Sequence, residues 1–213
     1  MLKAIRASML LAVVMALLCA AQAQKKSTLA AGEFRISSVD VAVTYDLERA
    51  KIVGTTCVCF WLNGAGAEAA VNFQHGLSVV GSFYGDHNGD IMSGVGLSKL
   101  EYLAGPRYTV DITHYTDRYT ARIIRKHSSS IFAEFLAGGS HGYESTFPSA
   151  SGVTSSASSF AMQAGGGLNV DLSGNFGLRA LEVDYLRTTL PNNAANSQND
   201  LRIAFGITYR FSK

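Results

Sequence analysis

The sequence has little proline, few cysteines, no excess of either charge and, beyond its first residues, no long apolar run. Three prolines stand against 21 glycines, and the formal net charge is +2. This near-neutral balance gives no electrostatic reason for nucleic-acid binding and no sign of disorder. No apolar run after residue 23 approaches the roughly 18 residues of a transmembrane helix, and helical periodicity is missing nearly everywhere. These absences exclude a helical membrane protein and favour an all-β chain.

The first 23 residues have the pattern of a secretory signal peptide. A basic start precedes an apolar run from Met9 to Ala20, and Ala21-Gln22-Ala23 supplies small residues for a cleavage site. The run is too short to span a bilayer comfortably as a retained anchor. We therefore expect cleavage before Gln24. The chain then has a signal peptide at residues 1–23, an N-terminal periplasmic lead-in at residues 24–37 and one folded domain at residues 38–211.

Two cysteines remain after the signal peptide, Cys57 and Cys59, in a compartment that permits disulfides. A Cys-x-Cys pair closes too small a ring for an unstrained bridge, and the stretch supplies too few ligands for a metal. Two free thiols and a bond to a neighbouring chain both stay open. The simplest interpretation is two small residues at a strand edge.

Apolar and polar residues alternate in eight segments, which predicts eight antiparallel strands. In the last segment, LRIAFGITYRF, every second residue is apolar or aromatic, and the residues between are small, polar or cationic. Because successive side chains of a strand point to opposite faces, each segment has one apolar and one polar face. The predicted strands cover residues 37–48, 61–73, 77–85, 99–112, 131–139, 159–172, 176–188 and 201–211.

The connections alternate between long and short, which is the pattern of transmembrane barrels. Tight turns are predicted at residues 74–76 and 173–175. Long polar loops are predicted at residues 48–58, 86–96, 141–158 and 188–199. Residues 113–129 break the pattern, being long and basic where a short turn is expected, so they are either an elaborated periplasmic turn or an error in the strand count. This segment could bind lipid phosphates, but a solvated turn is the more common role of such a basic run. The basic residues are Arg118, Arg122, Arg125, Lys126 and His127.

Three features indicate that the apolar face meets lipid. Aromatic residues gather near strand ends, the polar face is mostly small residues with isolated charges, and many segments approach the nine to eleven residues of a tilted membrane strand. We predict an all-β, eight-stranded, antiparallel up-and-down transmembrane β-barrel that is monomeric and contacts outer-membrane lipid. A soluble periplasmic binding barrel is the alternative, because alternation alone permits it.

Two stretches carry a family resemblance. Residues 165–211, GGGLNVDLSGNFGLRALEVDYLRTTLPNNAANSQNDLRIAFGITYRF, resemble the closing part of small bacterial outer-membrane barrels of the OmpA-like transmembrane type, and YLAGPRYTV at residues 102–110 resembles their fourth strand. The resemblance covers roughly residues 38–211 and implies the fold and the outer membrane, while function varies widely on this barrel. In that family the barrel-insertion machinery reads the terminal aromatic residues. Here Tyr209 and Phe211 match them, although Ser212 and Lys213 follow.

Charged residues on the polar face predict an ion-pair network inside the barrel, because an unpaired buried charge is costly. The network is predicted to comprise Glu68, Glu101, Arg107, Glu134, Asp171, Glu182, Asp184, Arg202 and Arg210. Arg107 and Arg202 are expected to pair with Glu68, Glu134 or Glu182. Side chains fill the interior of eight-stranded barrels, which favours a closed plug over a gated ion path.

No catalytic constellation or metal site is predicted, and no cofactor. His141 and Ser145, with Glu144 between them, are rim candidates for a lipid-modifying enzyme, but no Gly-x-Ser-x-Gly elbow accompanies them. The stretch DHNGD resembles the start of a calcium-binding loop, with Asp86, Asn88 and Asp90 as oxygen donors. Leu97 occupies the position where such a loop needs a bidentate Glu, so we interpret the stretch as a polar surface turn. We therefore expect a structural or surface-interaction barrel whose loops meet an unidentified extracellular ligand, with a narrow channel as the alternative.

Overall fold

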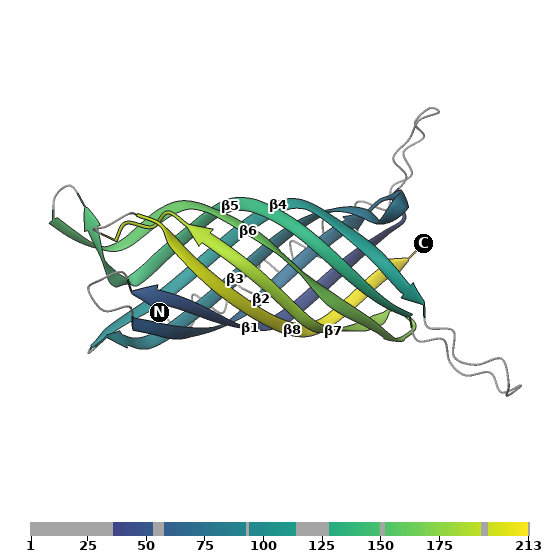
Figure 1. Ribbon diagram of the computed structural model, residues 1–213, viewed down its shortest axis with the longest axis horizontal. Coiled ribbons are helices and arrows are strands. Elements are labelled where there is room, and N and C mark those ends of the chain that lie inside the picture. The colour runs from purple at the N-terminus through teal and green to yellow at the C-terminus, as the bar shows by residue number, and fades with distance from the viewer. Residues whose placement is uncertain are drawn as a thin grey trace, which may run out of the picture.

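The computed structural model describes residues 36–52, 58–92, 94–113, 128–149, 152–192 and 196–212. Eight antiparallel strands close into one barrel in sequence order (Figure 1), which confirms the predicted up-and-down topology. The strands are β1 (Ser38–Ile52), β2 (Val58–Asn72), β3 (Leu77–Met92), β4 (Val95–Thr113), β5 (Ser128–Ser149), β6 (Gly152–Ser173), β7 (Phe176–Thr188) and β8 (Gln198–Ser212). A single 3-10 turn, η1 (Gln74–Gly76), joins β2 to β3.

Several predictions fall outside the described residues. The signal peptide, most of the lead-in, Cys57 and the five basic residues between 114 and 127 all belong to this group. Cys59 lies on β2 opposite Lys51, is half-buried, and forms no disulfide with any residue that the structure describes. None of the described segments forms a helix long and apolar enough to cross a membrane.

The two ends of the barrel differ. The turn end carries η1, the β6–β7 turn, the start of β1 and the end of β8, and lies at the right of Figure 1 beside the C-terminus. Its turns are tight because Gly76 and Gly174 adopt left-handed backbone angles, with φ of 78° and 56°. The hairpin end carries the connections β1–β2, β3–β4, β5–β6 and β7–β8, with β5 and β6 the longest strands at 22 residues each.

The predicted long loops at 86–96 and 141–158 are mostly strand, which is a correction to the sequence reading. β3 continues to Met92, and β5 and β6 stay paired to their ends, where Ser149 is opposite Gly152. Both faces of these extensions are polar, so the alternation that marks a strand disappears while the backbone ladder continues. The interpretation of DHNGD as a surface turn is also wrong, because Asp86 lies within β3 and is buried.

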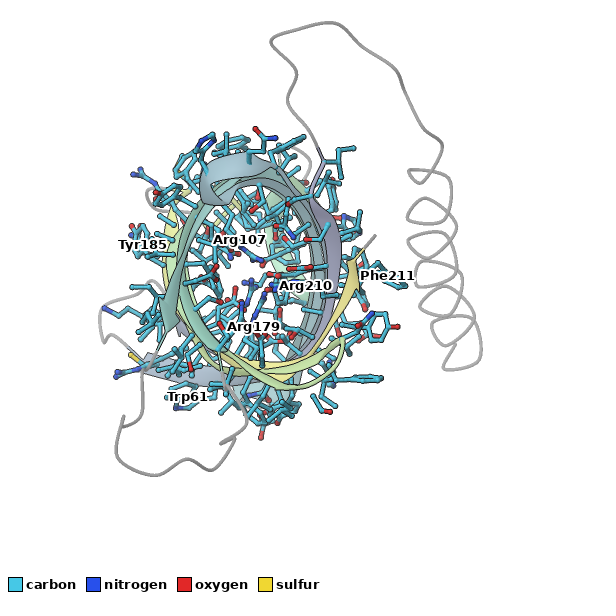
Figure 2. All side chains as sticks on the ribbon, turned by 90° about the vertical axis from the view of Figure 1, so that its right-hand side faces the viewer. Trp61, Arg107, Arg179, Tyr185, Arg210 and Phe211 are labelled. Atoms are coloured by element: carbon cyan, nitrogen blue, oxygen red, sulfur yellow. The ribbon has the colours of Figure 1, made fainter. Side chains whose placement is uncertain are left out.

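The outer face of the barrel is apolar. Large apolar side chains that face outward on β1, β3, β4, β5, β6, β7 and β8 include Val43, Val79, Tyr108, Ile131, Phe160, Val183 and Ile207. Figure 2, viewed along the barrel, shows Trp61, Tyr185 and Phe211 pointing away from the lumen and Arg107 and Arg179 pointing into it. Outward apolar and inward charged residues are the arrangement that a lipid-facing barrel requires.

Gly206 lets β8 close against β1 to complete the barrel. A Cβ atom at this position would lie 2.1 Å from the Val43 carbonyl oxygen and 2.7 Å from Thr44 Cα, which are backbone atoms that cannot give way without breaking the ladder. At Gly81, on the outer face of β3, a Cβ atom would meet nothing within 4 Å.

We predict that Gly206→Val lowers the unfolding free energy by about 1–3 kcal/mol, as overpacking does in a tight site. Gly81→Val, which adds the same side chain where space is free, should stay within about 0.5 kcal/mol of the wild type. Urea unfolding of the refolded barrel in detergent micelles measures both. Equal losses for the two variants would contradict a special role for the β1–β8 contact.

Candidate functional site

Buried charged side chains fill the lumen in two clusters. The hairpin-side cluster contains two basic residues, Lys99 and Arg202, among the carboxyl groups of Asp46, Glu48, Asp86, Glu101 and Asp200. The turn-side cluster contains Arg107 and Arg179 among Glu68, Glu134 and Glu182. Asp184 is also fully buried, and the field of both Arg202 and Arg179 reaches it. The two clusters are joined by side chains described below, so the lumen holds one continuous network.

Lys99 lies at the side of the hairpin-side cluster that is nearest the hairpin end. Its ammonium donates to Glu48 and lies 3.0 Å from Glu101 Oε1 and 3.8 Å from Asp200 Oδ2. These partners come from β1, β4 and β8, so the contacts tie together strands that are distant in sequence. Lys99 therefore closes the lumen just below the hairpin end.

Arg202 lies at the centre of the hairpin-side cluster and is fully buried. Its Nη2 donates to Glu101 and, at 3.1 Å, to Glu48 Oε2. Asp86 Oδ2 lies 3.5 Å from Nη2 and Asp46 Oδ2 lies 3.7 Å from Nε, both longer than a hydrogen bond of normal strength. The guanidinium also stacks 4.0 Å above the Tyr84 ring. A single planar cation thus serves four carboxyl groups from three strands.

In the turn-side cluster, two guanidinium groups share one aromatic ring and one carboxylate. Arg107 lies 4.2 Å and Arg179 4.8 Å from the centre of the Phe132 ring. Both donate to Glu68 Oε2, Arg107 at 2.8 Å. Arg107 Nε donates to Glu134 Oε2 at 2.6 Å, and Arg179 Nη1 donates to Glu182 Oε2 at 2.8 Å. Each arginine therefore has two carboxylate partners and a ring face.

Two uncharged side chains link the clusters. The Tyr84 hydroxyl donates to Glu68 Oε1 at 3.0 Å while its ring supports Arg202. Gln163 donates through Nε2 to Glu134 at 3.0 Å and accepts from Arg202 Nη1 at 3.2 Å. Because no group here is free to turn without leaving a buried partner unpaired, the network stiffens the lumen as well as filling it.

Acidic groups outnumber basic groups in this network. Nine buried carboxyl groups face four buried basic groups, and the imbalance is larger at the hairpin side, where five carboxyl groups face Lys99 and Arg202. Both oxygens of Asp46, Asp86 and Asp184 and one oxygen of Asp200 have no hydrogen-bond partner. Since buried carboxylates without partners are costly, these positions favour a proton or an added cation.

Seven of the nine predicted network residues come together in the lumen, and two do not. The buried members are Glu68, Glu101, Arg107, Glu134, Glu182, Asp184 and Arg202. Arg107 pairs with Glu68 and Glu134, as predicted. Arg202 pairs with Glu101 and Glu48, and not with the predicted partners Glu68, Glu134 or Glu182. Arg210 lies two residues from the end of β8, is 45% exposed, and pairs with Asp40 at 3.0 Å at the turn end. It points inward at the mouth of the barrel (Figure 2) but is partly exposed and lies outside the buried network, and Asp171 is only half-buried.

Arg179 is the main network residue that the sequence did not indicate. Strict alternation places it on the same face as Leu181 and Val183, which are exposed on the outer face. The register slips by one residue at Ala180, since Leu168 is opposite Leu181 while Asn169 is opposite Arg179. This bulge turns the arginine inward. An arginine in an otherwise apolar row was the only available signal.

The predicted insertion signal lies on the outer face near the turn end. The Tyr209 ring packs edge-on against Phe211 at 4.6 Å and against Phe176 at 4.9 Å between ring centres. This aromatic cluster is suited to the membrane–water interface. Recognition by the insertion machinery remains a prediction.

The rim residues weighed for catalysis are not arranged as a hydrolase triad. His141 Nδ1 lies 2.7 Å from Ser158 Oγ, and no contact of His141 with Ser145 is found. Elsewhere on the rim, Ser98 donates to Glu144 at 2.7 Å and lies 2.7 Å from His87 Nδ1. A triad needs the imidazole between the hydroxyl and the acid, whereas here Ser98, itself buried, stands between them.

Comparison with known proteins identifies the fold. No family model matches the chain, and no curated protein matches its sequence. Among solved structures, it is similar to Ail, the attachment invasion locus protein of Yersinia pestis, crystallised with the heparin analogue sucrose octasulfate, at 20% identity and a TM-score of 0.51 over 83% of this chain and 100% of that one. The chain has the fold of small bacterial outer-membrane barrels. Neisserial surface protein A is a second such barrel, with 13% identity and a TM-score of 0.50 over 80% of this chain and 97% of that one.

Proposed function

We propose that this protein is an outer-membrane barrel with its hairpin end at the cell surface, acting there in a structural or surface-interaction role rather than as an open channel. The observation that carries the proposal is the contrast between a lumen closed by buried ion pairs and hairpins that extend past the apolar belt. Beyond Phe160 the outward residues of β5 and β6 become mostly polar, although Val153 is exposed, and β5 continues for ten residues from Ser140 to Ser149. That is about 30 Å of strand at roughly 3.3 Å per residue.

Surface presentation is consistent with the fold and with the charges. Ail is described as an attachment invasion protein and the Neisserial barrel as a surface protein. Rigid strands hold the hairpin tips clear of the membrane, where binding residues of barrels usually lie. A closed lumen leaves these tips as the part of the chain that can meet an external partner. Catalysis of lipid modification is not part of the proposal, because the rim residues that the structure describes form no triad of the needed order.

Orientation can be tested by labelling two single cysteines on whole cells, in a Cys57→Ser, Cys59→Ser background. Val153→Cys, 71% exposed in the β5–β6 hairpin, should react with a membrane-impermeant maleimide. Asn175→Cys, exposed in the β6–β7 turn at the turn end, should react only after the cells are opened. The reverse pattern would place the hairpins in the periplasm and overturn the proposed surface role.

Closure can be tested by inserting the purified barrel into planar bilayers. We expect no resolved conductance steps, because the described lumen has no path that avoids both clusters. Steady ion-selective steps from the wild-type protein would instead support the channel alternative.

A further inference from the structure

A cavity of about 230 Å³ opens at the hairpin end, above Lys99. Its walls are mainly apolar, with large apolar side chains from four strands and the β7–β8 connection: Phe60, Ile91, Leu97, Phe147, Leu190 and Pro191. Phe147 and Leu190 are buried although they stand beyond the apolar belt, so they turn toward the cavity side of the wall. An apolar chamber at the exposed end of a barrel excludes water and suits the carbon skeleton of a small ligand.

The floor of the same cavity is charged. It is formed by Glu48, Lys99 and Asp200, all buried. Asp200 Oδ1 has no hydrogen-bond partner, and the Lys99 ammonium lies 3.8 Å from the other oxygen. Lys51 also lines the cavity, but its side chain is exposed. Glu48 also pairs with Lys99, so two carboxyl groups share one ammonium group at the base of the chamber. Neighbouring carboxyl groups favour a proton or a cationic donor between them.

The charge of the surroundings determines which ligand fits. With five carboxyl groups against two basic ones, the hairpin-side cluster has a deficit of positive charge immediately below the cavity. A carboxylate or phosphate would meet like charge there, and a neutral apolar molecule would leave Asp200 Oδ1 unpaired. An ammonium group would donate to that oxygen and reduce the deficit, while its carbon skeleton would occupy the apolar walls.

We propose that the hairpin-end cavity binds a small amphiphilic amine, with its ammonium on Asp200 and its apolar body against Phe147 and Leu190. The cavity is small beside typical drug-sized pockets of about 300–1,000 Å³, so the ligand is the size of an aryl-alkyl or short alkyl amine. Specificity comes from the floor, since the walls alone distinguish poorly between apolar bodies of similar shape.

The test compares two probes of nearly equal shape, 2-phenylethylammonium and 2-phenylethanol. Binding to the full barrel in phosphatidylcholine nanodiscs is measured by saturation-transfer NMR titration, with empty nanodiscs subtracted. The ammonium should bind at least about tenfold more tightly than the alcohol, as a hydrogen bond to a charged group implies. Asp200→Asn should abolish that preference and leave alcohol binding unchanged, while Phe147→Ala should weaken both probes.

Asp111→Asn is the matched control, because it removes the same charge at the exposed turn end. It should leave both affinities unchanged. Equal affinities of the two probes for the wild type, or a preference that survives Asp200→Asn, would overturn the proposal. Should Asp200→Asn not refold, the wild-type preference and competition between the two probes decide it without the variant.

Discussion

Replacing Arg202 with alanine is expected to lower the unfolding free energy by about 3–5 kcal/mol, the usual cost of removing one partner of a buried ion pair. The guanidinium is fully buried, and its removal leaves Lys99 as the only described cation near the carboxyl groups of Asp46, Glu48, Asp86 and Glu101. Water that enters the vacated space carries no charge to compensate them. Many molecules should therefore fail to reach the compact folded form.

Arg210→Ala is the matched control on the same strand. Its pair with Asp40 is half-exposed at the turn end, and exposed pairs contribute at most about 1 kcal/mol. Both variants can be followed by urea unfolding in lipid vesicles through the fluorescence of Trp61, the only tryptophan in the sequence. Similar losses for Arg202→Ala and Arg210→Ala would show that burial of the cluster contributes nothing special.

Arg179→Ala should lower the unfolding free energy by about 3 kcal/mol or more, because Glu182 then loses its only ion-pair partner among the described residues. Glu68 would retain Arg107 alone, and the Phe132 ring would lose one of its two stacked guanidinium groups. Arg187→Ala, on the same strand but facing outward and exposed, should leave the unfolding midpoint unchanged.

A compensating pair separates charge from packing. Arg179→Met combined with Glu182→Leu removes both charges and keeps the volume, so part of the stability lost in Arg179→Ala should return. The midpoints of the single and double variants form a double-mutant cycle. A double variant less stable than Arg179→Ala would contradict the view that an uncompensated buried carboxylate causes the loss.

The barrel and its faces could be predicted from the sequence because a barrel with an apolar outer face and a polar lumen requires strict alternation. Glu68 and Arg107 each stand among apolar neighbours at even spacing, so their inward direction follows from the period of a strand. Arg179 could not be placed in this way, since one extra residue at Ala180 reverses the direction of every side chain before it.

Part of the hairpin-side cluster was not predicted from the sequence, for a different reason. Glu48 and Asp86 lie where the strands rise beyond the apolar belt, and both faces there are polar. Without alternation, strand and loop look the same in sequence, so Asp86 falls in a predicted loop and Glu48 at the boundary between a predicted strand and a predicted loop. The cavity above Asp200 was hidden likewise, because Phe147 and Leu190 come from segments read as loops and meet only in the folded chain.

The central claim is that the apolar outer face meets the lipid of an outer membrane while charged side chains close the lumen. Fractionation of expressing cells, with the outer-membrane sample run on a gel boiled and unboiled, tests it most directly. A closed barrel resists detergent until heated, so we predict that the protein is in this fraction and that its mobility changes on boiling. Recovery in the soluble periplasm with no mobility change would contradict the account.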